Sequence, residues 1–500
     1  MKSNARLTVV LDAIRHCVDA RCYGHFAEHL GRCIYGGIWT DPHGGIANVG
    51  GLRSDVVRAL RRIRPPVVRW PGGCFADYYH WEDGIGPRAS RRRRWNLWWC
   101  QPEPNTFGTD EFMAFCHAIG AEPNICLNVG SGSPQEALAW LEYCNADQDT
   151  TYARLRARNG HRQPYGVRLW AVGNESYGCG GRFTAESYAA EFRRFACFLR
   201  KFPAEKRLEL IACGHTAEWN ARLLRALEGA HDLWDLLSVH RYVGNRRGEK
   251  GSATEFSDEQ HYYLMADVSL VEQTLREVTG LLDAGGRALS DKGIALDEWG
   301  TWWPEATTPN GLFQQNSLRD ALFAARCLHI FHCYPRLRMA NIAQMVNVLQ
   351  ALLLTEGRRM VLTPTYHVFN LMQGHQGSHV VETRLECPRL PLSGEESPAL
   401  SIGATLSSDR RELLLSVTNV LLTAEVQLDI EIAHGATQWQ ETQILTAADI
   451  HAHNTFAHPR AVQPIAASAP TSLRSGWRVH LPPKSLVVLN LAVATQRRRP

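Results

Sequence analysis

The sequence predicts an α/β protein in which a (β/α)8 TIM barrel is followed by a smaller antiparallel β-sandwich. The chain has 500 residues, which is long enough for one large domain and one small domain. From about residue 20 to 375, short apolar runs alternate with longer amphipathic runs. From 376 onward the texture changes to strand-like alternation of apolar and polar residues.

The first region reads as repeated βα units around a parallel sheet. The strand-like runs are PPVVRW (65–70), AEPNICLNVG (121–130), VRLWAVGN (167–174), LELIACG (208–214), LLSVHRY (236–242) and GIALDEWG (293–300). Helical periodicity appears in EFMAFCHAIG (111–120), PQEALAWLEYC (134–144) and SLRDALFAARCLHIF (317–331). This pattern fits a (β/α)8 barrel better than a six-stranded open sheet, so we predict a catalytic barrel over residues 20–375.

The second region has period-two alternation separated by turns that contain Ser, Pro and Gly. Its strand-like runs are ELLLSVTNV (412–420), AEVQLDIEIA (424–433) and SLVVLNLAV (485–493). Such runs are typical of an antiparallel, jelly-roll-like β-sandwich, which we predict over residues 376–500. The run ARLTVVLD (5–12) has the same alternation, and we expect a strand from residues 1–19 to join that sandwich.

The composition argues against several kinds of partner. The 54 basic and 50 acidic residues nearly cancel to a net charge of +4, so we expect no nucleic-acid binding, and the four arginines at 91–94 are expected in a solvated loop. The sequence contains neither the apolar core of a secretory signal at its start nor a run long enough to span a membrane. We therefore predict a cytoplasmic protein without membrane contact.

The 14 cysteines are scattered without short regular spacing, and no CxxC pair occurs. A chain of this length does not need cross-links to fold, so reduced thiols are expected for most of them. The nearest His and Cys combinations lack the spacing of zinc ligands. We therefore predict neither a metal nor a cofactor.

Carboxylates close two of the predicted strands. Asn174 and Glu175 follow the apolar run LWAV, and Asp297 and Glu298 follow IAL. Because barrel active sites form where the strands end, the two glutamates can face each other across the barrel mouth. His240 and Tyr242 reach the same edge from LLSVHRY, between the two carboxylate-bearing strands in sequence.

Two carboxylates among Trp and Tyr suit glycoside hydrolysis. One must donate a proton to the leaving oxygen, while the other meets the positive charge that develops on the sugar. A glutamate can also stand at a helix N-terminus without any catalytic role. The residues alone therefore leave open a non-catalytic carbohydrate-binding protein, or a metal-dependent aldolase or isomerase barrel, for which only His240 is well placed.

At this point the chain resembles glycoside hydrolase family 51, the α-L-arabinofuranosidases. The matching runs span nearly the whole chain in order, and they are 24–39 (GHFAEHLGRCIYGGIW), 67–87 (VVRWPGGCFADYYHWEDGIGP), 105–132, 172–181 (VGNESYGCGG), 238–242 (SVHRY), 295–303 (ALDEWGTWW), 340–351 (ANIAQMVNVLQA) and 444–456 (ILTAADIHAHNTF). The resemblance implies a retaining, exo-acting enzyme that removes terminal α-L-arabinofuranosyl residues. It also implies a homo-oligomer, often a hexamer, and an enzyme that needs no cofactor. Another retaining glycosidase on the same scaffold, a β-xylosidase or an endoglucanase, remains the nearest alternative.

By position, Glu175 resembles the family's general acid/base and Glu298 its nucleophile. Their carboxyl groups are then expected about 5 to 5.5 Å apart, with environments that separate their pKa values so that Glu175 starts protonated. Glu28 resembles the carboxylate that holds sugar hydroxyls, and Asn174 the residue that bonds the sugar 2-hydroxyl.

His240 and Tyr242 correspond to a pair that orients the nucleophile and lines the sugar subsite, and Gln344 to a further sugar contact. Where many members have Asn after the Gly-Gly turn, this chain has Cys74. A thiol is a poorer hydrogen-bonding group than an amide, so sugar hydroxyls there are expected to meet backbone groups or water. Because Cys179 follows Glu175 closely, a Cys74–Cys179 disulfide is a further hypothesis.

Overall fold

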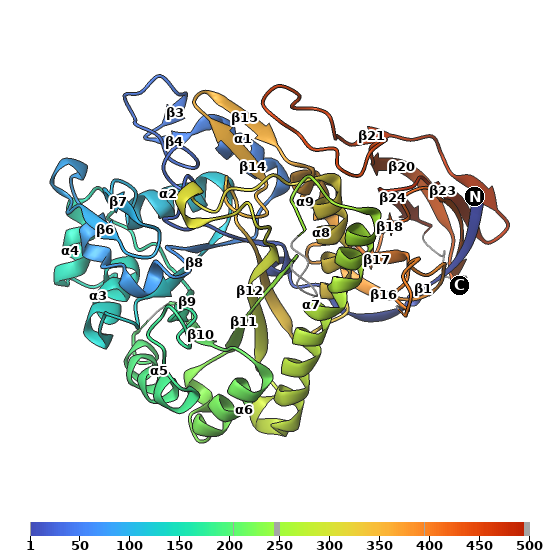
Figure 1. The fold of residues 1–500 in the computed structure, drawn as a ribbon. Coiled ribbons are helices and arrows are strands. Elements are labelled where there is room, and N and C mark those ends of the chain that lie inside the picture. The colour runs from blue at the N-terminus through green and yellow to red at the C-terminus, as the bar shows by residue number, and fades with distance from the viewer. Residues whose placement is uncertain (1, 204, 245–250, 395, 495–500) are drawn as a thin grey trace.

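The computed structural model describes residues 2–203, 205–244, 251–394 and 396–494. It consists of a barrel and a separate sheet that lie side by side (Figure 1). No helix in these residues is both long enough and apolar enough to cross a membrane.

In the described part of the chain, eight parallel strands close into a barrel, as predicted. They are β2 (Gly24–Phe26), β5 (Val67–Trp70), β8 (Glu122–Leu127), β9 (Leu169–Val172), β10 (Glu209–Cys213), β11 (Leu236–Val243), β12 (Gly293–Thr301) and β13 (Leu337–Ala343). Every residue of β5, β9 and β12 is buried, because helices cover the outside of a parallel barrel. The chain can therefore place polar side chains reliably at the ends of these strands.

The helices surround the barrel in chain order. They are α1 (Ser54–Ile63), α2 (Thr109–Ile119), α3 (Pro134–Asn145), α4 (Thr151–Arg158), α5 (Ala185–Leu199), α6 (Ala217–Ala226), α7 (Asp258–Ala284), α8 (Leu318–Phe331) and α9 (Pro364–Met372). Their starts follow local rules. The Ser133 side chain accepts the backbone N–H of Glu136 ahead of Pro134, and Thr184 and Ser187 cap α5 reciprocally.

Short elements decorate the loops at the barrel ends. The hairpins are β3 (Asn48–Val49) with β4 (Leu52–Arg53), β6 (Arg94–Asn96) with β7 (Gln101–Glu103), and β14 (Leu353–Glu356) with β15 (Arg359–Leu362). The 3-10 helices are η1 (Ala20–Tyr23), η2 (Ala76–Tyr78), η3 (Trp81–Gly84), η4 (Arg88–Ser90), η5 (His231–Leu233), η7 (Gly286–Leu289), η8 (Thr308–Asn310) and η9 (Gln373–His375).

The expectation that arginines 91–94 form a solvated loop is only partly right. Arg92, Arg93 and Arg94 are exposed, but Arg91 is buried. The Arg91 guanidinium donates to both carboxylate oxygens of Glu111 at 2.9 Å. This ion pair attaches the arginine-rich segment to α2. Because the carboxylate of Glu111 neutralises the Arg91 guanidinium, this arginine can be buried.

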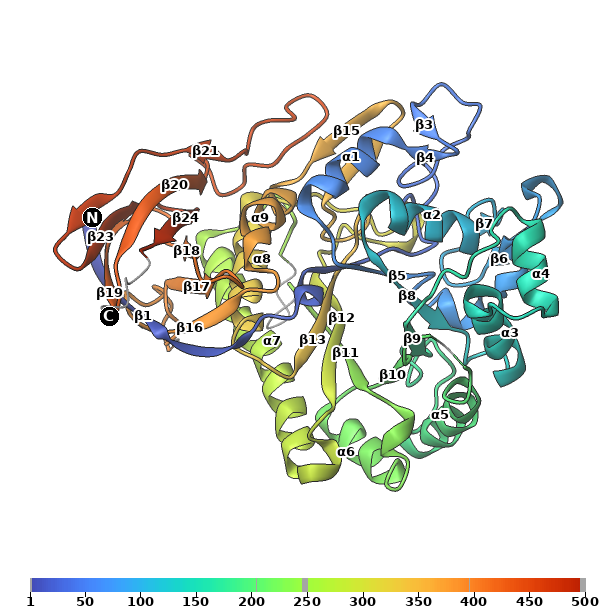
Figure 2. The same ribbon diagram turned by 180° about the vertical axis from the view of Figure 1, so that it is seen from behind.

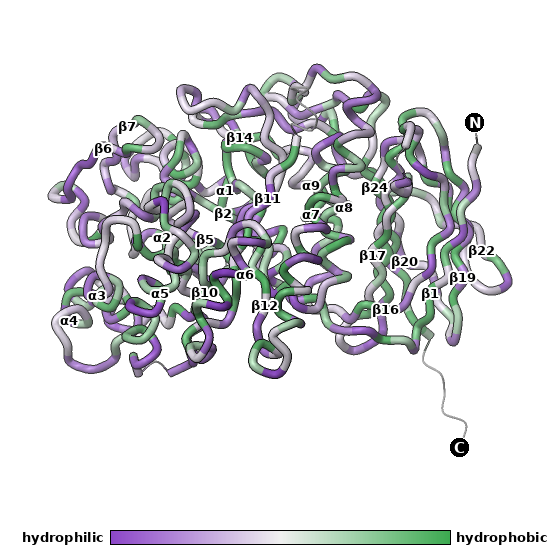
Figure 3. Tube along the Cα trace, turned by 60° about the horizontal axis from the view of Figure 1, so that its bottom comes forward, coloured by the Kyte–Doolittle hydropathy of each residue, from purple (hydrophilic) through white to green (hydrophobic). Residues whose placement is uncertain are grey.

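The second sheet is hydrogen-bonded through ten strands in the described residues. In chain order they are β1 (Lys2–Cys17), β16 (His379–Glu386), β17 (Leu400–Leu406), β18 (Glu412–Asn419), β19 (Glu425–Ala433), β20 (Thr437–Leu445), β21 (Ile465–Ala466), β22 (Thr471–Leu473), β23 (Gly476–Leu481) and β24 (Ser485–Val493). Hydrophobic and hydrophilic residues alternate along β19 (Figure 3), and its hydrophobic residues from Val426 to Ile432 are buried. This is the alternation from which the sheet was predicted.

Strand β1 lies between β16 and β19, seen as the blue ribbon within the red sheet in Figure 2. It runs antiparallel to β16 but parallel to β19, so the sheet is not purely antiparallel. Helices α8 and α9 pack between this sheet and the barrel, contacting β17, β18, β20 and β24. The second sheet therefore braces the face of the barrel that carries these two helices.

Candidate active site

The structure brings the predicted site residues together at the carboxyl ends of the barrel strands. Glu28 follows β2, Cys74 follows β5, Asn174 and Glu175 follow β9, His240 and Tyr242 lie in β11, Glu298 lies in β12, and Gln344 follows β13. These strands converge at one mouth because all eight run in the same direction.

Glu298 is buried and surrounded by hydrogen-bond donors. Arg69 Nη1 donates to its Oε1 at 2.8 Å, and the Tyr242 hydroxyl donates to its Oε2 at 2.8 Å. His240 Nδ1 lies 3.5 Å from the same Oε2. These contacts hold the carboxylate in one orientation.

Arg69 is the cation beneath this site, and its side chain is 1% exposed. Besides Glu298 it donates to Asn174 Oδ1 at 2.5 Å, and its Nε lies 3.4 Å from Asp297 Oδ2. Burial alone would lower the pKa of the Arg69 guanidinium. The negative charges of Asp297 and Glu298 outweigh this and raise the pKa well above its ordinary value. The arginine therefore links the end of β9 to the end of β12.

Glu175 faces the same space from β9 with its backbone at φ +39°, a region that non-glycine residues seldom occupy. Its Oε1 accepts hydrogen bonds from the Tyr177 hydroxyl at 3.0 Å and from His240 Nδ1 at 2.9 Å. Burial is the largest single influence and favours the neutral carboxyl, but the hydrogen bond and charge of His240, together with Tyr177 and Arg69, lower the pKa of Glu175. This direction is opposite to the expectation that Glu175 holds its proton in the free site.

His240 is the neighbouring group whose surroundings favour a bound proton. Its Nε2 is 3.0 Å from Asp297 Oδ1 while its Nδ1 faces Glu175. Burial alone would lower the pKa of this imidazole, but the negative charges of Glu298 and Asp297 raise it to about 10. His240 Nδ1 lies 2.9 Å from Glu175 and 3.5 Å from Glu298. The imidazole can therefore exchange a proton with Glu175 while it also lies beside Glu298.

Glu28 forms the other wall of the site. Its Oε1 accepts from the Trp99 indole at 2.9 Å and from the Phe75 backbone at 3.1 Å, and its Oε2 accepts from Gln344 at 3.1 Å. Burial and the charge of Glu298 raise the pKa of Glu28 to about 7. A Cβ on Gly73 would lie 2.4 Å from Oε2, so the Gly-Gly turn is what admits this carboxylate.

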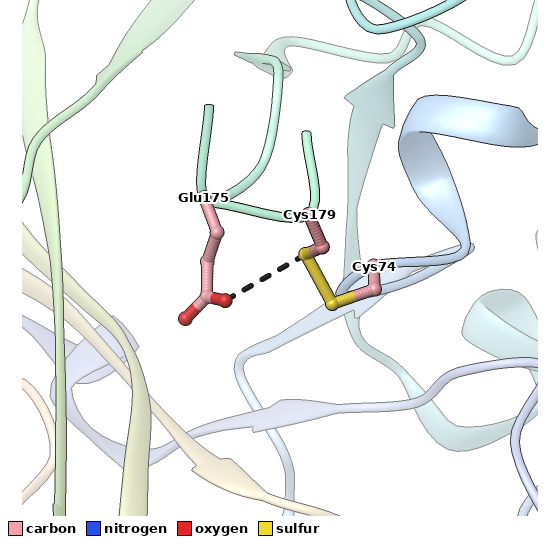
Figure 4. A group of neighbouring side chains, drawn as sticks. All are labelled: Cys74, Glu175 and Cys179. Carbon is pink, nitrogen blue, oxygen red and sulfur yellow. Dashed lines mark hydrogen bonds between the residues drawn. A yellow bond between two sulfur atoms is a disulfide. The ribbon is translucent and has the colours of Figure 1, made fainter. Parts of the chain in front are cut away.

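Cys74 and Cys179 are joined by a disulfide, as hypothesised, with their Cα atoms 5.6 Å apart. The bond ties the loop after β5 to the loop after β9 and lies beside Glu175 (Figure 4). The remaining 12 cysteines in the described residues are free, which agrees with the expectation of reduced thiols elsewhere.

Four residues that support the site were not singled out from the sequence, namely Arg69, Asp77, Trp99 and Tyr177, and Asp297 was named at its strand end without a role. Asp77 accepts the backbone N–H groups of Val129, Gly130 and Asn174 at 2.7 to 2.9 Å, and so fastens β8 to β9. A charged residue within the apolar strand VVRW was the available signal for Arg69, since buried charges require partners.

Two groups of side chains in the described residues have a composition that could hold a metal ion. One is Cys74, Glu175 and Cys179, and the other is Glu175, His240 and Glu298. In each group the candidate ligand atoms lie within 4.8 Å of one another. Both groups contain Glu175, so its carboxylate is a candidate ligand in either one.

Comparison with known proteins agrees with this geometry. Residues 59–264 match the model of the α-L-arabinofuranosidase 1 domain, and residues 297–485 that of the α-L-arabinofuranosidase C-terminal domain. The chain is 40% identical to the intracellular exo-α-L-arabinofuranosidase of Bacteroides ovatus over 503 residues, covering 98% of this chain and 96% of that protein.

Solved structures give the same result. The family 51 arabinofuranosidase of Xanthomonas axonopodis pv. citri superposes with a TM-score of 0.93 at 38% identity, covering 98% of this chain and 99% of that one. The arabinose complex of the Thermotoga maritima α-L-arabinofuranosidase gives 0.88 at 34% identity, with 98% and 100% covered. The chain with this barrel and this pair of facing glutamates therefore belongs to glycoside hydrolase family 51, the α-L-arabinofuranosidases.

Proposed function

We propose that this arabinofuranosidase removes terminal non-reducing α-L-arabinofuranosyl residues by a retaining double displacement. The observation that carries the proposal is the spacing of Glu175 and Glu298, which have carboxylate oxygens within 4.8 Å of each other. Retaining glycosidases place their two carboxyl groups about 5 to 5.5 Å apart, whereas inverting ones need room for a water between them.

In the first step Glu298 attacks C1 of the arabinofuranosyl ring while Glu175 protonates the leaving oxygen. The lowered pKa of Glu175 in the free site means that its proton comes from His240, 2.9 Å away. When Glu298 becomes an ester it loses its charge, and His240 loses one of the two carboxylates that hold its proton. In the second step Glu175 takes a proton from the water that attacks C1, and L-arabinose leaves as Glu298 becomes a carboxylate again. Glu175 then returns this proton to His240, which restores the starting state of the site.

The sugar is held by the remaining polar groups of the mouth. Glu28 and Gln344 are bonded to each other and are placed to meet two hydroxyls on one edge of the ring. The carbonyl of the Asn174 side chain is fixed by Arg69, which leaves its amide for the 2-hydroxyl. Cys74 lies in the disulfide, so this loop offers hydroxyls only its backbone. These steps use no metal and no cofactor.

The proposed substrates are arabino-oligosaccharides, arabinan or arabinoxylan, and the proposed location is the cytoplasm, which the name of the Bacteroides ovatus relative supports. In the cytoplasm, short oligosaccharides are the substrates most able to reach the enzyme. A homo-oligomer, with a hexamer as one form, stays a prediction that light scattering after gel filtration would test.

Hydrolysis of 4-nitrophenyl α-L-arabinofuranoside tests the function. We expect wild type to be active, Glu298→Ala to be inactive, and Glu175→Ala to stall after the first step, because nitrophenolate leaves without a proton. Glu191→Ala, which changes a partly exposed carboxylate on α5, is the control. If wild type does not hydrolyse this substrate but cleaves a nitrophenyl xyloside or a glucan, the proposed specificity for arabinofuranosyl residues is wrong. The proposed glycosidase mechanism would then still hold. Proton NMR of the first product formed distinguishes retention from inversion.

A further inference from the structure

The disulfide beside Glu175 places two sulfur atoms and a carboxylate in one small space (Figure 4). Cys179 Sγ lies 3.7 Å from Glu175 Oε2, and the candidate ligand atoms of Cys74, Cys179 and Glu175 all lie within 4.8 Å of one another. The three residues are only partly buried, so small ions in solvent can reach them. The other group of this kind in the described chain contains no sulfur.

The disulfide is a poor metal ligand, but the dithiol is a good one. A small dithiol can reduce the bond: its two sulfurs close into a cyclic disulfide, and its two electrons and two protons pass to Cys74 and Cys179. Reducing compartments keep thiols in this form. When a divalent cation binds, the two thiols release their protons to solvent and bind as thiolates.

The geometry suits tetrahedral zinc. With Zn–S about 2.3 Å and Zn–O about 2.0 Å, two sulfurs lie about 3.8 Å apart and a sulfur and an oxygen about 3.5 Å apart. The observed distance of 3.7 Å between Cys179 Sγ and Glu175 Oε2 is close to the second value. The Cα atoms of the two cysteines are 5.6 Å apart, so side-chain rotation alone can open the sulfurs to the first value.

We propose that reduction of the disulfide turns Cys74, Cys179 and Glu175 into a site for a thiophilic divalent cation such as Zn²⁺, and that the bound cation stops the enzyme. Water completes the tetrahedron as the fourth ligand. A carboxylate that binds zinc cannot deliver a proton to the leaving oxygen. The inhibition, though not the binding, rests on the proposed role of Glu175 as acid/base.

The test compares oxidised and reduced enzyme. The protein is reduced with dithiothreitol, freed of it by gel filtration under argon, and dialysed against ZnCl₂, and bound zinc is measured by mass spectrometry. We expect the reduced form to bind about one more zinc ion per chain than the oxidised form. Replacing zinc by Co²⁺ should give the near-ultraviolet absorption of thiolate-to-cobalt charge transfer. Neither readout depends on activity.

Activity is measured in the same samples. Zinc should lower the turnover of the reduced enzyme about 100-fold, the size of a lost general acid, and a chelator should restore it. The oxidised enzyme should respond far less. If zinc binds but turnover does not fall, the site stands and the assignment of Glu175 as acid/base is what fails.

Two variants locate the site. Cys179→Ser should remove the extra zinc and the cobalt absorption from the reduced protein, whereas Cys197→Ser, an exposed free thiol on α5, should leave both as in wild type. Equal zinc binding by reduced and oxidised wild type would overturn the proposal. So would undiminished binding by Cys179→Ser, which would point to the cluster of Glu175, His240 and Glu298.

Discussion

The floor of the active site and the β6–β7 hairpin beside it use opposite kinds of side chain. On the floor, buried Glu298 and Asp297 are paired with buried Arg69. In the hairpin segment, Trp95, Leu97 and Trp98 are 53%, 56% and 42% exposed, although the next residue, Trp99, reaches inward to Glu28. Within the described residues these are half of the exposed large hydrophobic side chains.

From this difference we expect the floor and the β6–β7 hairpin to act on different parts of the substrate. Fixed charges in a buried site act on the bond that breaks, because they are already oriented when charge develops there. Exposed aromatic faces can instead stack on sugars that lie outside the pocket. Changes on the floor should therefore reduce kcat with any substrate, and changes in the hairpin should raise KM only for substrates long enough to reach it.

The largest effect is expected for Arg69→Met. The variant leaves Glu298 and Asp297 buried without the arginine that pairs with both of them, which should cost about 3 kcal/mol of unfolding free energy and lower kcat/KM about 10³-fold. Denaturant unfolding and initial rates on the nitrophenyl substrate measure the two effects. Arg194→Met, which breaks an exposed pair on α5, should change neither. A variant of normal stability and activity would show that the floor does not depend on this charge.

His240→Gln should come next, with kcat lower by about 100-fold. In wild type the His240–Glu175 pair holds a proton up to the raised pKa of His240, about 10. Without the imidazole the proton must stay on Glu175, whose pKa rises but remains that of a carboxyl group. The alkaline limb of kcat/KM should therefore move to lower pH, as measured in buffers from about pH 5 to 10. An alkaline limb that stays in place would exclude His240 as the proton source.

Tyr242→Phe should have a smaller effect. It removes one hydrogen bond to Glu298, at 2.8 Å, and should lower kcat about tenfold while KM stays nearly constant. Single-turnover measurement of nitrophenol release isolates the attack step. Tyr152→Phe removes a comparable bond to Glu82 on the surface and serves as the control. If KM rises instead of kcat falling, Tyr242 contacts the sugar rather than the nucleophile.

The smallest effect is expected for Trp98→Ala. Loss of one stacking face should raise KM for arabinan about threefold and leave the nitrophenyl substrate unaffected, because that substrate ends within the pocket. The matched control is Phe198→Ala, an aromatic of similar exposure on α5. Parallel changes with both substrates would remove the distinction between floor and hairpin.

The sequence predicts most of the barrel because its strands are buried and short. Six of the strands appear as apolar runs followed by polar residues, and the two facing glutamates come after the apolar residues of β9 and within β12. Strands β2 and β13 were not singled out. β2 has only three residues, and the polar Asn341 interrupts the apolar residues of β13 although it is itself buried.

The support of the site is harder to predict than the site itself. Arg69 and Trp99 act through contacts with Glu298 and Glu28, which are far away in the sequence. A run such as RRRRWNLWWC shows charge and aromatic content but not which side chain turns inward. The lowered pKa of Glu175 likewise depends on the placement of His240, at 2.9 Å, which sequence spacing does not encode.

Strand β1 has a consequence for synthesis of the protein on the ribosome. Thr8 pairs with Arg384 on one side and with Glu431 on the other, so β1 emerges long before either neighbour exists. At about 5 to 20 residues per second this amounts to tens of seconds. During that time an alternating strand with both edges open is free to pair wrongly with another nascent chain. Moving β1 to the other end of the chain by circular permutation, with its pairing to β16 and β19 kept, would shorten this exposure.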